Sequence, residues 1–377
     1  MHWLRRGGSI LLFVLGGVVG QLAFSPVYRF EPIRPFTGKS WYNPFQGDTL
    51  EWSRANFHIH TQNWGGLTAG RRSPQEVISV YDSLGYTWIG LSEYQRINPS
   101  SPILLYEHGW GIGKVHQLCF WAEKVVWWDY PFFQTLSAKQ HIIALLRPTT
   151  RFLVLAHPRF LHGYTGQELS LLGGYDAVEV LNRYGDSVAE WDSALSSGHY
   201  ASIIASDNAH DAYNPHQVMS RWTEVGVPSS ASIKLLERAL LGGRTVAYKN
   251  RTPFPLSGPY PRFRLIKIEG DTLLRVQLSH RVDTLRIIGQ GGTVRAVAYD
   301  SDEITYSIRV YDTYLRIEAY TSEVEAYTGA LVRSGPHRRD IPGIDRMATA
   351  IQSIALGILS LSALLGGWWL LRTRADR

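Results

Sequence analysis

The chain has 377 residues, of which 45% are hydrophobic, and a formal net charge of +6. A chain of this length predicts two or three domains with sizeable cores. The charge lies at the two ends: residues 1–25 carry +2 and residues 337–377 carry +3, which leaves the body near neutral. We therefore expect no nucleic-acid partner. The single cysteine, Cys119, excludes an internal disulfide framework.

An apolar stretch from Gly7 to Phe24 follows Arg5 and Arg6. A membrane helix needs about 20 apolar residues to cross a bilayer core, and this stretch is close to that length. It is therefore either a signal peptide or a membrane helix. No clear cleavage site with small residues follows the stretch. We interpret residues 1–25 as an uncleaved membrane anchor.

A second apolar stretch, Met347 to Leu371, has no charged residue over 25 positions and ends in Trp368 and Trp369. Arginines follow the tryptophans, which is typical of the exit from a membrane. A buried helix of a soluble domain is the alternative, but an uncharged segment of this length rarely packs inside one. The pattern predicts a transmembrane helix over residues 346–371.

Arginines flank both predicted membrane helices on their outer sides. Under the positive-inside rule both flanks lie in the cytoplasm, and the body between them lies outside it. Three arginines on the inner side of the second helix weaken this asymmetry: Arg338, Arg339 and Arg346. The expected location is a membrane, with an extracytoplasmic body.

Residues 26–54 are rich in proline, glycine and aromatic residues without a sustained period, and we interpret them as a connector. Over residues 55–250, strand patterns alternate with helix patterns, which predicts an α/β barrel-like domain. One helix begins at Ser73 with capping-box spacing and ends at Gly85. The other predicted elements are strands at Ala55–Thr61, Tyr86–Ser92, Phe152–Ala156, Ala177–Leu181 and Tyr200–Ser206, and a helix at Ser187–Leu195.

Over residues 255–335 the helical periods end, and short alternating runs follow, separated mostly by glycine or aspartate turns. This pattern predicts a small all-β, sandwich-like domain whose role is packing or spacing. The predicted strands are Phe263–Ile268, Leu273–Leu278, Thr284–Ile288, Val294–Ala298, Ile304–Val310 and Tyr314–Ala319.

Histidines and carboxylates recur where the predicted strands of the barrel-like domain end. His58 and His60 alternate along the first strand and therefore point to one side. In a parallel barrel the carboxyl ends of the strands meet on one face, where such folds place their active sites. The residues of metal-ligand type are His58, His60, Glu93, Glu107, His116, His157, Asp207 and His210.

Imidazoles with carboxylates suit zinc, manganese or iron, and a carboxylate can bridge two cations about 3.5 to 4 Å apart. Such a pair activates water and clamps the oxygens of a displacement reaction. A single histidine at a strand end is more often a structural residue than a ligand. The recurrence of these residues at successive strand ends indicates a hydrolytic metal site.

Five motifs follow one another in a fixed order over residues 55–250. They are Phe57-His58-Ile59-His60-Thr61, Leu91-Ser92-Glu93-Tyr94, Glu107 with His116, Ala156-His157-Pro158 and Ser206-Asp207-Asn208-Ala209-His210. This order resembles that of the PHP superfamily, the polymerase and histidinol phosphatase domains. The resemblance implies a distorted (β/α)7 barrel, two or three divalent metals and phosphoesterase activity.

Carried over position by position, the resemblance implies that Glu107 bridges two metals. The implied ligands are His58, His60, Glu107 and Asp207 for one metal, Glu107, His116 and His157 for the second, and His210 for a third. The chain departs from the family at the third site, where Tyr94 replaces a histidine. Another usual histidine falls at Trp64, Gly65 and Gly66. We therefore predict a two-metal site.

Three residues near the motifs are candidates for contact with a substrate: Arg159, Asn182 and Arg183. A guanidinium group binds phosphate oxygens in a bidentate manner. Solvated loop charges are the alternative for the arginines.

The leading hypothesis is a phosphoesterase in which metal-activated water attacks a phosphate ester in line, and Asp207 or Glu93 takes its proton. Glu93 is equally a candidate ligand or a partner of one. Attack on an ester or amide carbonyl is a variant. The competing hypothesis, which Tyr94 favours, is a catalytically degenerate barrel that acts as a binding or structural protein of a membrane complex. The sequence predicts no particular protein partner.

Overall fold

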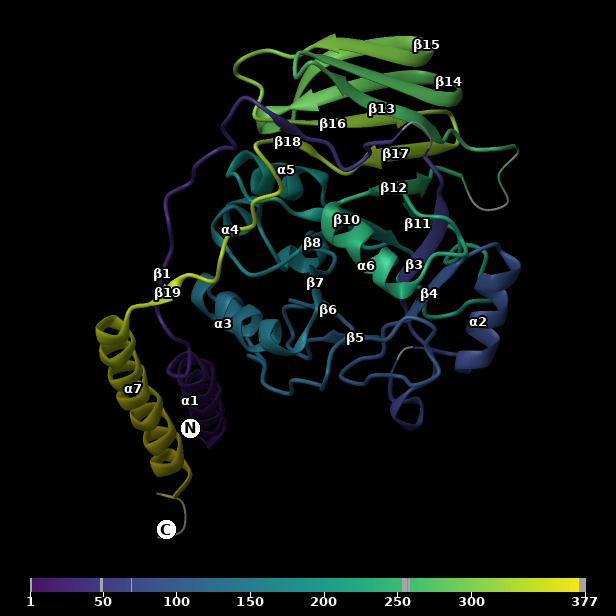
Figure 1. Ribbon diagram of the computed structural model, residues 1–377. Helices are drawn as coiled ribbons and strands as arrows, with labels where there is room; N and C mark the ends of the chain where they lie inside the picture. The colour runs from purple at the N-terminus through teal and green to yellow at the C-terminus, as the bar shows by residue number, and fades with distance from the viewer. Residues whose placement is uncertain (1, 48–49, 69, 253–255, 257, 373–377) are drawn as a thin grey trace.

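The computed structural model describes every residue except 1, 48–49, 69, 253–255, 257 and 373–377. The predicted boundary at Pro255 lies outside the described residues, as do Arg374 and Arg377, two of the arginines that predict the topology. The described chain has a mixed α/β fold with curled sheets, and two helices extend away from its body (Figure 1).

A six-stranded sheet carries one half of the candidate site. In order across the sheet its strands are β10 (Ser202–Ser206), β8 (Ala177–Asn182), β7 (Phe152–Leu155), β6 (Gln117–Phe120) and β5 (Leu105–His108), with β9 (Gly185–Asp186) beside β8. β7, β8 and β10 are parallel, whereas β6 is antiparallel to both of its neighbours. This sheet therefore departs from strict parallel strand–helix alternation.

An 11-stranded sheet carries the other half of the site at one end. Its main order is β13 (Phe263–Glu269), β14 (Leu273–Gly289), β16 (Tyr314–Tyr320), β17 (Val324–Thr328), β12 (Thr245–Asn250), β11 (Arg221–Val225), β3 (Ser53–Ile59) and β4 (Trp88–Leu91). Off this path lie β15 (Thr293–Ser307), beside β14, and β18 (Leu331–Arg333), which joins β16 to β2 (Trp41–Tyr42). β3 is parallel to β4 and antiparallel to β11.

Isolated parallel bridges join the two sheets on both sides of the site. Ile59 bridges to Ala209, beyond β10, and Gly90 bridges to Ile103, just before β5. A third bridge joins Tyr94 to Glu107. The sheets are therefore curled around a shared interior.

The predicted all-β region consists of fewer and longer strands than we expect from its sequence. The second and third predicted runs form the single strand β14, and the fourth run and the part of the fifth up to Ser307 form β15. The β14–β15 register shifts between Gln277 and Val282, where an irregularity interrupts the alternation as a turn would. The separation of these runs into individual strands is therefore wrong. β17 pairs with β12, so this region continues the sheet that contains β3.

One hydrophobic cluster crosses this continuous sheet. It joins Tyr81 and Leu91, near the candidate site, to Leu285 and Ile317 in the outer strands. The outer strands therefore share a core with the elements that position the site.

Local signals define the helices of the body. The Ser73 hydroxyl accepts a hydrogen bond from the Glu76 backbone N–H, and the Glu76 carboxylate accepts one from Ser73, which confirms the predicted capping box. The helices are α2 (Pro74–Ser83), α3 (Leu136–Leu146), α4 (Gly166–Leu171), α5 (Val188–Ser196) and α6 (Ile233–Gly242). Short 3₁₀ turns cover Trp64–Gly66, Arg147–Thr149, Phe160–His162 and Gln290–Gly292.

The two remaining helices, α1 (His2–Leu22) and α7 (Arg346–Arg372), extend from the body side by side (Figure 1). By length and composition α7 can cross a membrane, and among the described residues it is the one helix that meets both conditions. The apolar part of α1, Arg6–Leu22, is shorter.

Small residues line the contact between α1 and α7. The Ser360 hydroxyl donates to the Gly16 carbonyl at 2.7 Å, and the Ser9 hydroxyl donates to the Gly367 carbonyl at 2.8 Å. A Cβ atom at Gly16 would lie 2.8 Å from Leu364. Small side chains with interhelical hydrogen bonds are typical of helix pairs in membranes.

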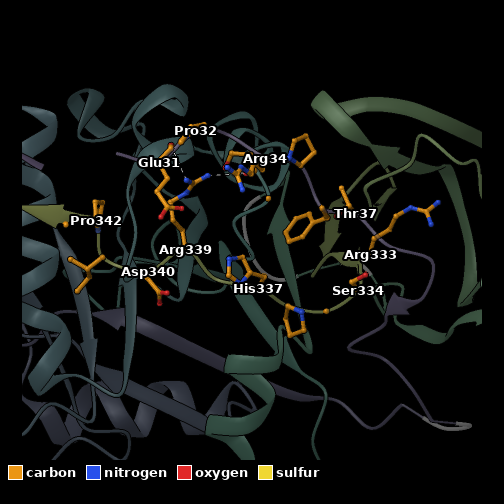
Figure 2. A pocket seen from close by; sticks show the side chains of 18 residues that line it. Glu31, Pro32, Arg34, Thr37, Arg333, Ser334, His337, Arg339, Asp340 and Pro342 are labelled. Atoms are coloured by element: carbon orange, nitrogen blue, oxygen red, sulfur yellow. Dashed lines mark hydrogen bonds between the residues drawn. The ribbon is translucent and has the colours of Figure 1, made fainter. Parts of the chain in front are cut away.

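Two connectors run together between this helix pair and the body. β1 (Tyr28–Arg29) pairs with β19 (Gly343–Ile344), and β2 pairs with β18. A cavity of 680 Å³ lies along the connectors (Figure 2). Arg333 donates to three backbone carbonyls and Arg339 to two, so these lining arginines hold the connectors together.

Gly198, which lines this cavity, is expected to be required for the approach of the N-terminal connector. Its φ is +79°, and a Cβ atom there would lie 2.0 Å from the Arg34 carbonyl oxygen. Gly198→Ala should lower the free energy of unfolding by about 1 to 3 kcal/mol through backbone strain alone. Thermal unfolding in detergent measures this, with Gly343→Ala as the control, because Gly343 has open space around it. Equal midpoints for the two variants would contradict the expectation.

Candidate metal centre

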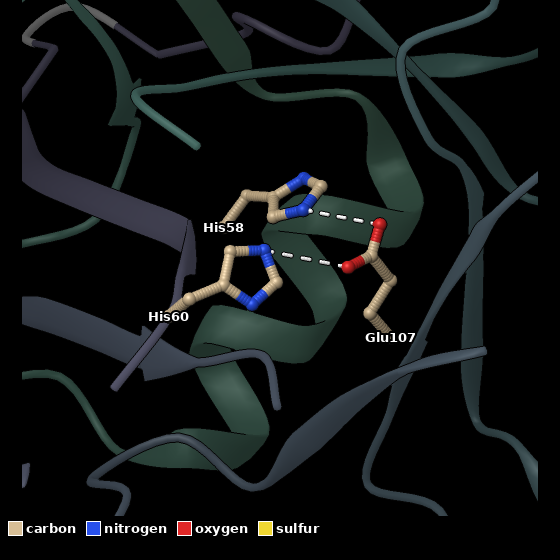
Figure 3. Close-up of side chains that lie close together, drawn as sticks. All are labelled: His58, His60 and Glu107. Carbon is tan, nitrogen blue, oxygen red and sulfur yellow. Dashed lines mark ion pairs between the residues drawn. The ribbon is translucent and has the colours of Figure 1, made fainter. Parts of the chain in front are cut away.

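The Glu107 carboxylate, on β5, lies at the centre of four histidine rings, and its side chain is fully buried. The distances to its oxygens are 3.3 Å from His58 Nε2, 3.4 Å from His60 Nε2, 2.6 Å from His116 Nδ1 and 3.2 Å from His157 Nε2. Figure 3 shows the carboxylate beside the first two rings, with one oxygen directed at each ring. Five residues of metal-ligand type that the sequence predicts are thus brought together.

Strand ends place the four rings on this carboxylate. His58 lies in β3 and His60 follows it, while His157 follows β7 directly. His116 instead precedes β6. Since β6 is antiparallel, its first residue, Gln117, pairs with the ends of β5 and β7, at His108 and Leu155. His116, which precedes the antiparallel strand β6, therefore lies at the same edge of the sheet as residues that follow the parallel strands.

Two groups of three side chains have donor atoms close enough to share a cation. They are His58, His60 and Glu107, and Glu107, His116 and His157, with the atoms of each group within 4.8 Å of one another. Glu107 belongs to both groups. Apart from Asp207, these are the ligand sets that the resemblance implies for two bridged metals.

Several donor atoms of these groups are buried without a hydrogen-bond partner among the described residues. They are His58 Nε2, His60 Nδ1 and Nε2, Glu107 Oε2, His116 Nε2 and His157 Nδ1. Buried polar atoms in proteins are nearly always paired. Imidazole nitrogens with a carboxylate suit zinc, manganese or iron, so the residues present fit such a cation.

The charges of the site are set by burial and by its own ion pairs. Burial raises the pKa of Glu107, but His116 and His58 outweigh this effect and hold that pKa well below its ordinary value. Burial lowers the pKa values of His60 and His116. The histidines therefore favour the ionised form of Glu107, and burial favours the neutral form of His60 and His116, which is the form that binds metal.

Glu179, on β8, is a candidate site residue that sequence reasoning misses. Its Oε1 lies 3.1 Å from His58 Nδ1, and its Oε2 accepts a hydrogen bond from the His157 backbone N–H at 2.9 Å. Burial lowers the pKa of His58, but Glu179 and Glu107 outweigh it and raise that pKa to about 10. A carboxylate on the far nitrogen of a histidine commonly orients it toward a metal. The available signal is one charged residue in an otherwise uncharged, buried strand.

Asp207 follows β10 as predicted, but its carboxylate contacts residues other than the four histidines around Glu107. Its oxygens accept hydrogen bonds from Asn56 Nδ2, Tyr81 OH, Ser220 Oγ and the backbone N–H groups of Met219, Ser220 and Arg221. Neither group of ligand atoms found among the described residues includes Asp207. Burial raises its pKa to about 6, against these hydrogen bonds. Its contacts are those of a residue that fixes the β10–β11 connection.

Glu93 also lies beside the site rather than in either group. Its side chain accepts hydrogen bonds from the Thr61 backbone N–H, at 3.2 Å, and from the Thr61 hydroxyl. Burial raises its pKa. Glu93 therefore holds the loop that leaves His60.

Tyr94 and His210 enclose His60 between their rings. The His60 ring stacks on His210 and on Tyr94, with ring centroids 4.5 Å apart in both pairs. Burial lowers the pKa of His210 to about 4 and raises the pKa of Tyr94. At neutral pH His210 is therefore uncharged and Tyr94 keeps its proton.

The three candidates for substrate contact differ in their surroundings. Arg159 is exposed, and Asn182 is buried, with its Oδ1 accepting from the Tyr184 backbone N–H at 3.0 Å. Arg183 is half-buried over the Tyr184 ring, and its Nη1 has no hydrogen-bond partner among the described residues. The charge of Arg183 also lowers the pKa of His210, so Arg183 is close enough to the site to influence its charges.

No family model, curated protein or solved structure matches this chain. The chemistry of the site therefore rests on the residues described above.

Replacing Glu179 should weaken metal binding without removing a ligand. In Glu179→Gln, His58 loses the carboxylate that orients it, and we expect a 10- to 100-fold loss of metal affinity, the usual effect of such partners. Titration with zinc or manganese after chelation measures the affinity. Glu325→Gln, in the outer strand β17, is the matched control. Equal affinities for wild type, Glu179→Gln and the control would contradict the orienting role.

Replacing Asp207 should reduce stability and leave metal affinity nearly unchanged. In Asp207→Asn the amide oxygen still accepts, but the amide nitrogen cannot accept from the donors that face the other carboxylate oxygen, so about 1 to 3 kcal/mol of stability should be lost for each buried donor left unpaired. Thermal unfolding of the metal-free protein and metal titration separate the two effects. A loss of one metal equivalent at unchanged stability would restore Asp207 as a ligand.

Proposed function

We propose that this chain is a metal-dependent hydrolase, specifically a phosphoesterase that holds two divalent cations on either side of Glu107. The observation that carries the proposal is the shared position of Glu107 in two buried ligand groups. A single structural cation would need only one of them. A bridging carboxylate is the arrangement of two-metal hydrolases.

The strand arrangement supports a finer proposal, a distorted seven-stranded barrel of the PHP type. β3, β4, β5, β6, β7, β8 and β10 follow one another around the site. Bridges at Gly90–Ile103 and Ile59–Ala209 lie where the two sheets meet. If the two sheets close into a barrel at these bridges, the ligands would lie on one rim, as the motif order implies.

The cations would supply Lewis acidity and lower the pKa of water. His58, His60 and Glu107 would hold one, and Glu107, His116 and His157 the other. Glu107 keeps its negative charge for both because the surrounding histidines lower its pKa. Glu179 fixes the His58 ring through Nδ1 and leaves Nε2 for the ligand role.

Residues around the two groups would bind and orient a phosphate ester. The Tyr94 hydroxyl remains protonated at neutral pH, since burial raises its pKa, and it can donate to an ester oxygen. Arg183 offers a guanidinium nitrogen that has no hydrogen-bond partner in the described part of the chain. Glu93 is a candidate proton acceptor, because burial raises its pKa toward the working range of a general base.

The second candidate function is a non-catalytic barrel, and His58 gives it a specific basis. With its pKa raised to about 10, a protonated His58 lies between Glu107 and Glu179 and forms an ion pair with each carboxylate without any metal. In that case the body would serve a membrane complex. We also propose, from the flanking arginines, that the body lies outside the cytoplasm.

Metal analysis and turnover of the full chain in detergent distinguish the two functions. We expect about two equivalents of zinc, manganese or iron and hydrolysis of bis(p-nitrophenyl) phosphate or p-nitrophenyl phosphate. In Glu107→Gln both metals and activity should be lost. The matched control is Glu318→Gln, because Glu318 lies on β16, one of the outer strands. Fewer than one equivalent after loading, with no turnover of either ester, would establish the non-catalytic function.

A further inference from the structure

Large apolar side chains are exposed together on one surface of the body, which we call the aromatic surface. Its residues are Trp64, Trp110, Ile112, Trp127, Trp128 and Phe133. Four of them are more than half exposed: Trp110 (53%), Trp127 (59%), Ile112 (61%) and Phe133 (71%). Contiguous exposed apolar side chains mark surfaces that meet a partner or a membrane.

The aromatic surface begins at the candidate metal centre. Trp64 Nε1 donates to the Tyr94 carbonyl at 2.9 Å, and the Tyr94 ring stacks on the ligand His60. The Trp64 ring also meets the Trp127 ring edge to face, with centroids 6.0 Å apart. The rim of the site is therefore continuous with the exposed tryptophans.

The other end of the aromatic surface reaches helix α1. Phe24, just beyond α1, packs edge to face on Trp128 at 5.7 Å. The Gln21 side chain donates to the Phe133 carbonyl at 3.0 Å and accepts from the Phe132 backbone N–H at 3.1 Å. Since α1 packs along α7, the surface is continuous with the helix pair. The lower edge of the body, below β5 and β6, lies on the side toward which these helices extend (Figure 1).

Polar contacts fix the backbone that carries these aromatic side chains. Asp129 Oδ2 accepts from the backbone N–H groups of Trp110, at 2.8 Å, and Gly111, at 3.0 Å. His108 Nε2 lies 3.0 Å from the Trp128 carbonyl oxygen. The exposed tryptophans are therefore carried on a backbone tied to the site-bearing strand β5.

We propose that the aromatic surface lies in the headgroup layer of the bilayer that α7 crosses, and that the ester hydrolysed at the metal centre belongs to a membrane phospholipid. Tryptophan prefers this layer because its ring is apolar and its N–H is polar. The surface connects the helix pair to the rim of the site, so a headgroup in this layer lies at the site. The substrate assignment rests on the proposed hydrolase function, whereas the membrane contact does not.

Depth measurements on the full chain in phosphatidylcholine vesicles test the membrane contact. Cys119 is buried, so Cys119→Ser gives a background without a thiol. A fluorescent label is attached to a cysteine introduced as Ile112→Cys or Trp127→Cys. Val310→Cys is the control, since Val310 is 92% exposed and lies in the turn that follows β15. We expect spin-labelled lipids to quench the first two labels at least threefold more than the control.

Two results would overturn the membrane contact. Equal quenching of all three labels by the aqueous quencher iodide would place the aromatic surface in water. Protection of the labels at 112 and 127 from both iodide and spin-labelled lipid would indicate a second copy or a protein partner instead.

Turnover of matched diesters tests the substrate class. Phosphatidylglycerol and phosphatidylcholine in vesicles are compared with the soluble diesters glycerophosphoglycerol and glycerophosphocholine. In the double variant Trp110→Ser, Trp127→Ser we expect turnover of the lipids to fall at least tenfold and turnover of the soluble diesters to change less than twofold. Turnover of the soluble diesters alone, in wild type, would overturn the lipid assignment and leave the hydrolase intact. No turnover of either, with metals absent, would overturn the hydrolase, and the labels would still report the membrane contact.

Discussion

A fully buried carboxylate is the constraint on which the centre of this fold depends. Ionised Glu107 has no access to water, and an uncompensated buried charge costs several kcal/mol. Four imidazoles from three separate segments of the chain surround this carboxylate, so the two sheets must curl until these segments meet. The same arrangement extends to Glu179, because it contacts Nδ1 of His58 while Nε2 of that ring faces Glu107. The curling of the sheets and the placement of the charged groups in the interior therefore depend on each other.

Sequence patterns were sufficient for the residues whose position follows from strand ends. The alternation of His58 and His60 along a buried strand fixes their common direction, and His157 follows a strand whose buried run is easily recognised. The capping box at Ser73 is equally local. His116 is predicted as a candidate ligand by its residue type, but its place before a strand is not, since the direction of β6 is a tertiary property that its short sequence does not encode.

The remaining carboxylates depend on geometry that no local pattern contains. Asp207 and Glu107 are equally good ligands by type, but the loop at Met219–Arg221 turns its N–H groups toward Asp207 and satisfies it. Glu179 lies inside a strand rather than at its end, and its partner is 121 positions away in the sequence. The outer strands present a different difficulty. In the sequence, a bulge interrupts the alternation of apolar and polar residues in the same way as a turn, so one long strand is predicted as two. Both kinds of error arise where partners distant in sequence decide the structure.

The pairing of β1 with β19, and of α1 with α7, also determines when this fold can be completed. These partners are separated by more than 300 positions, for example 344 between Gly16 and Ser360. At ribosomal rates of about 5 to 20 residues per second, the first helix waits roughly 15 to 70 s for its partner. Contacts of such sequence separation form late and slowly. During synthesis the glycine-lined face of α1 is therefore without its partner, and the nascent chain depends on other molecules to cover that face until α7 is made.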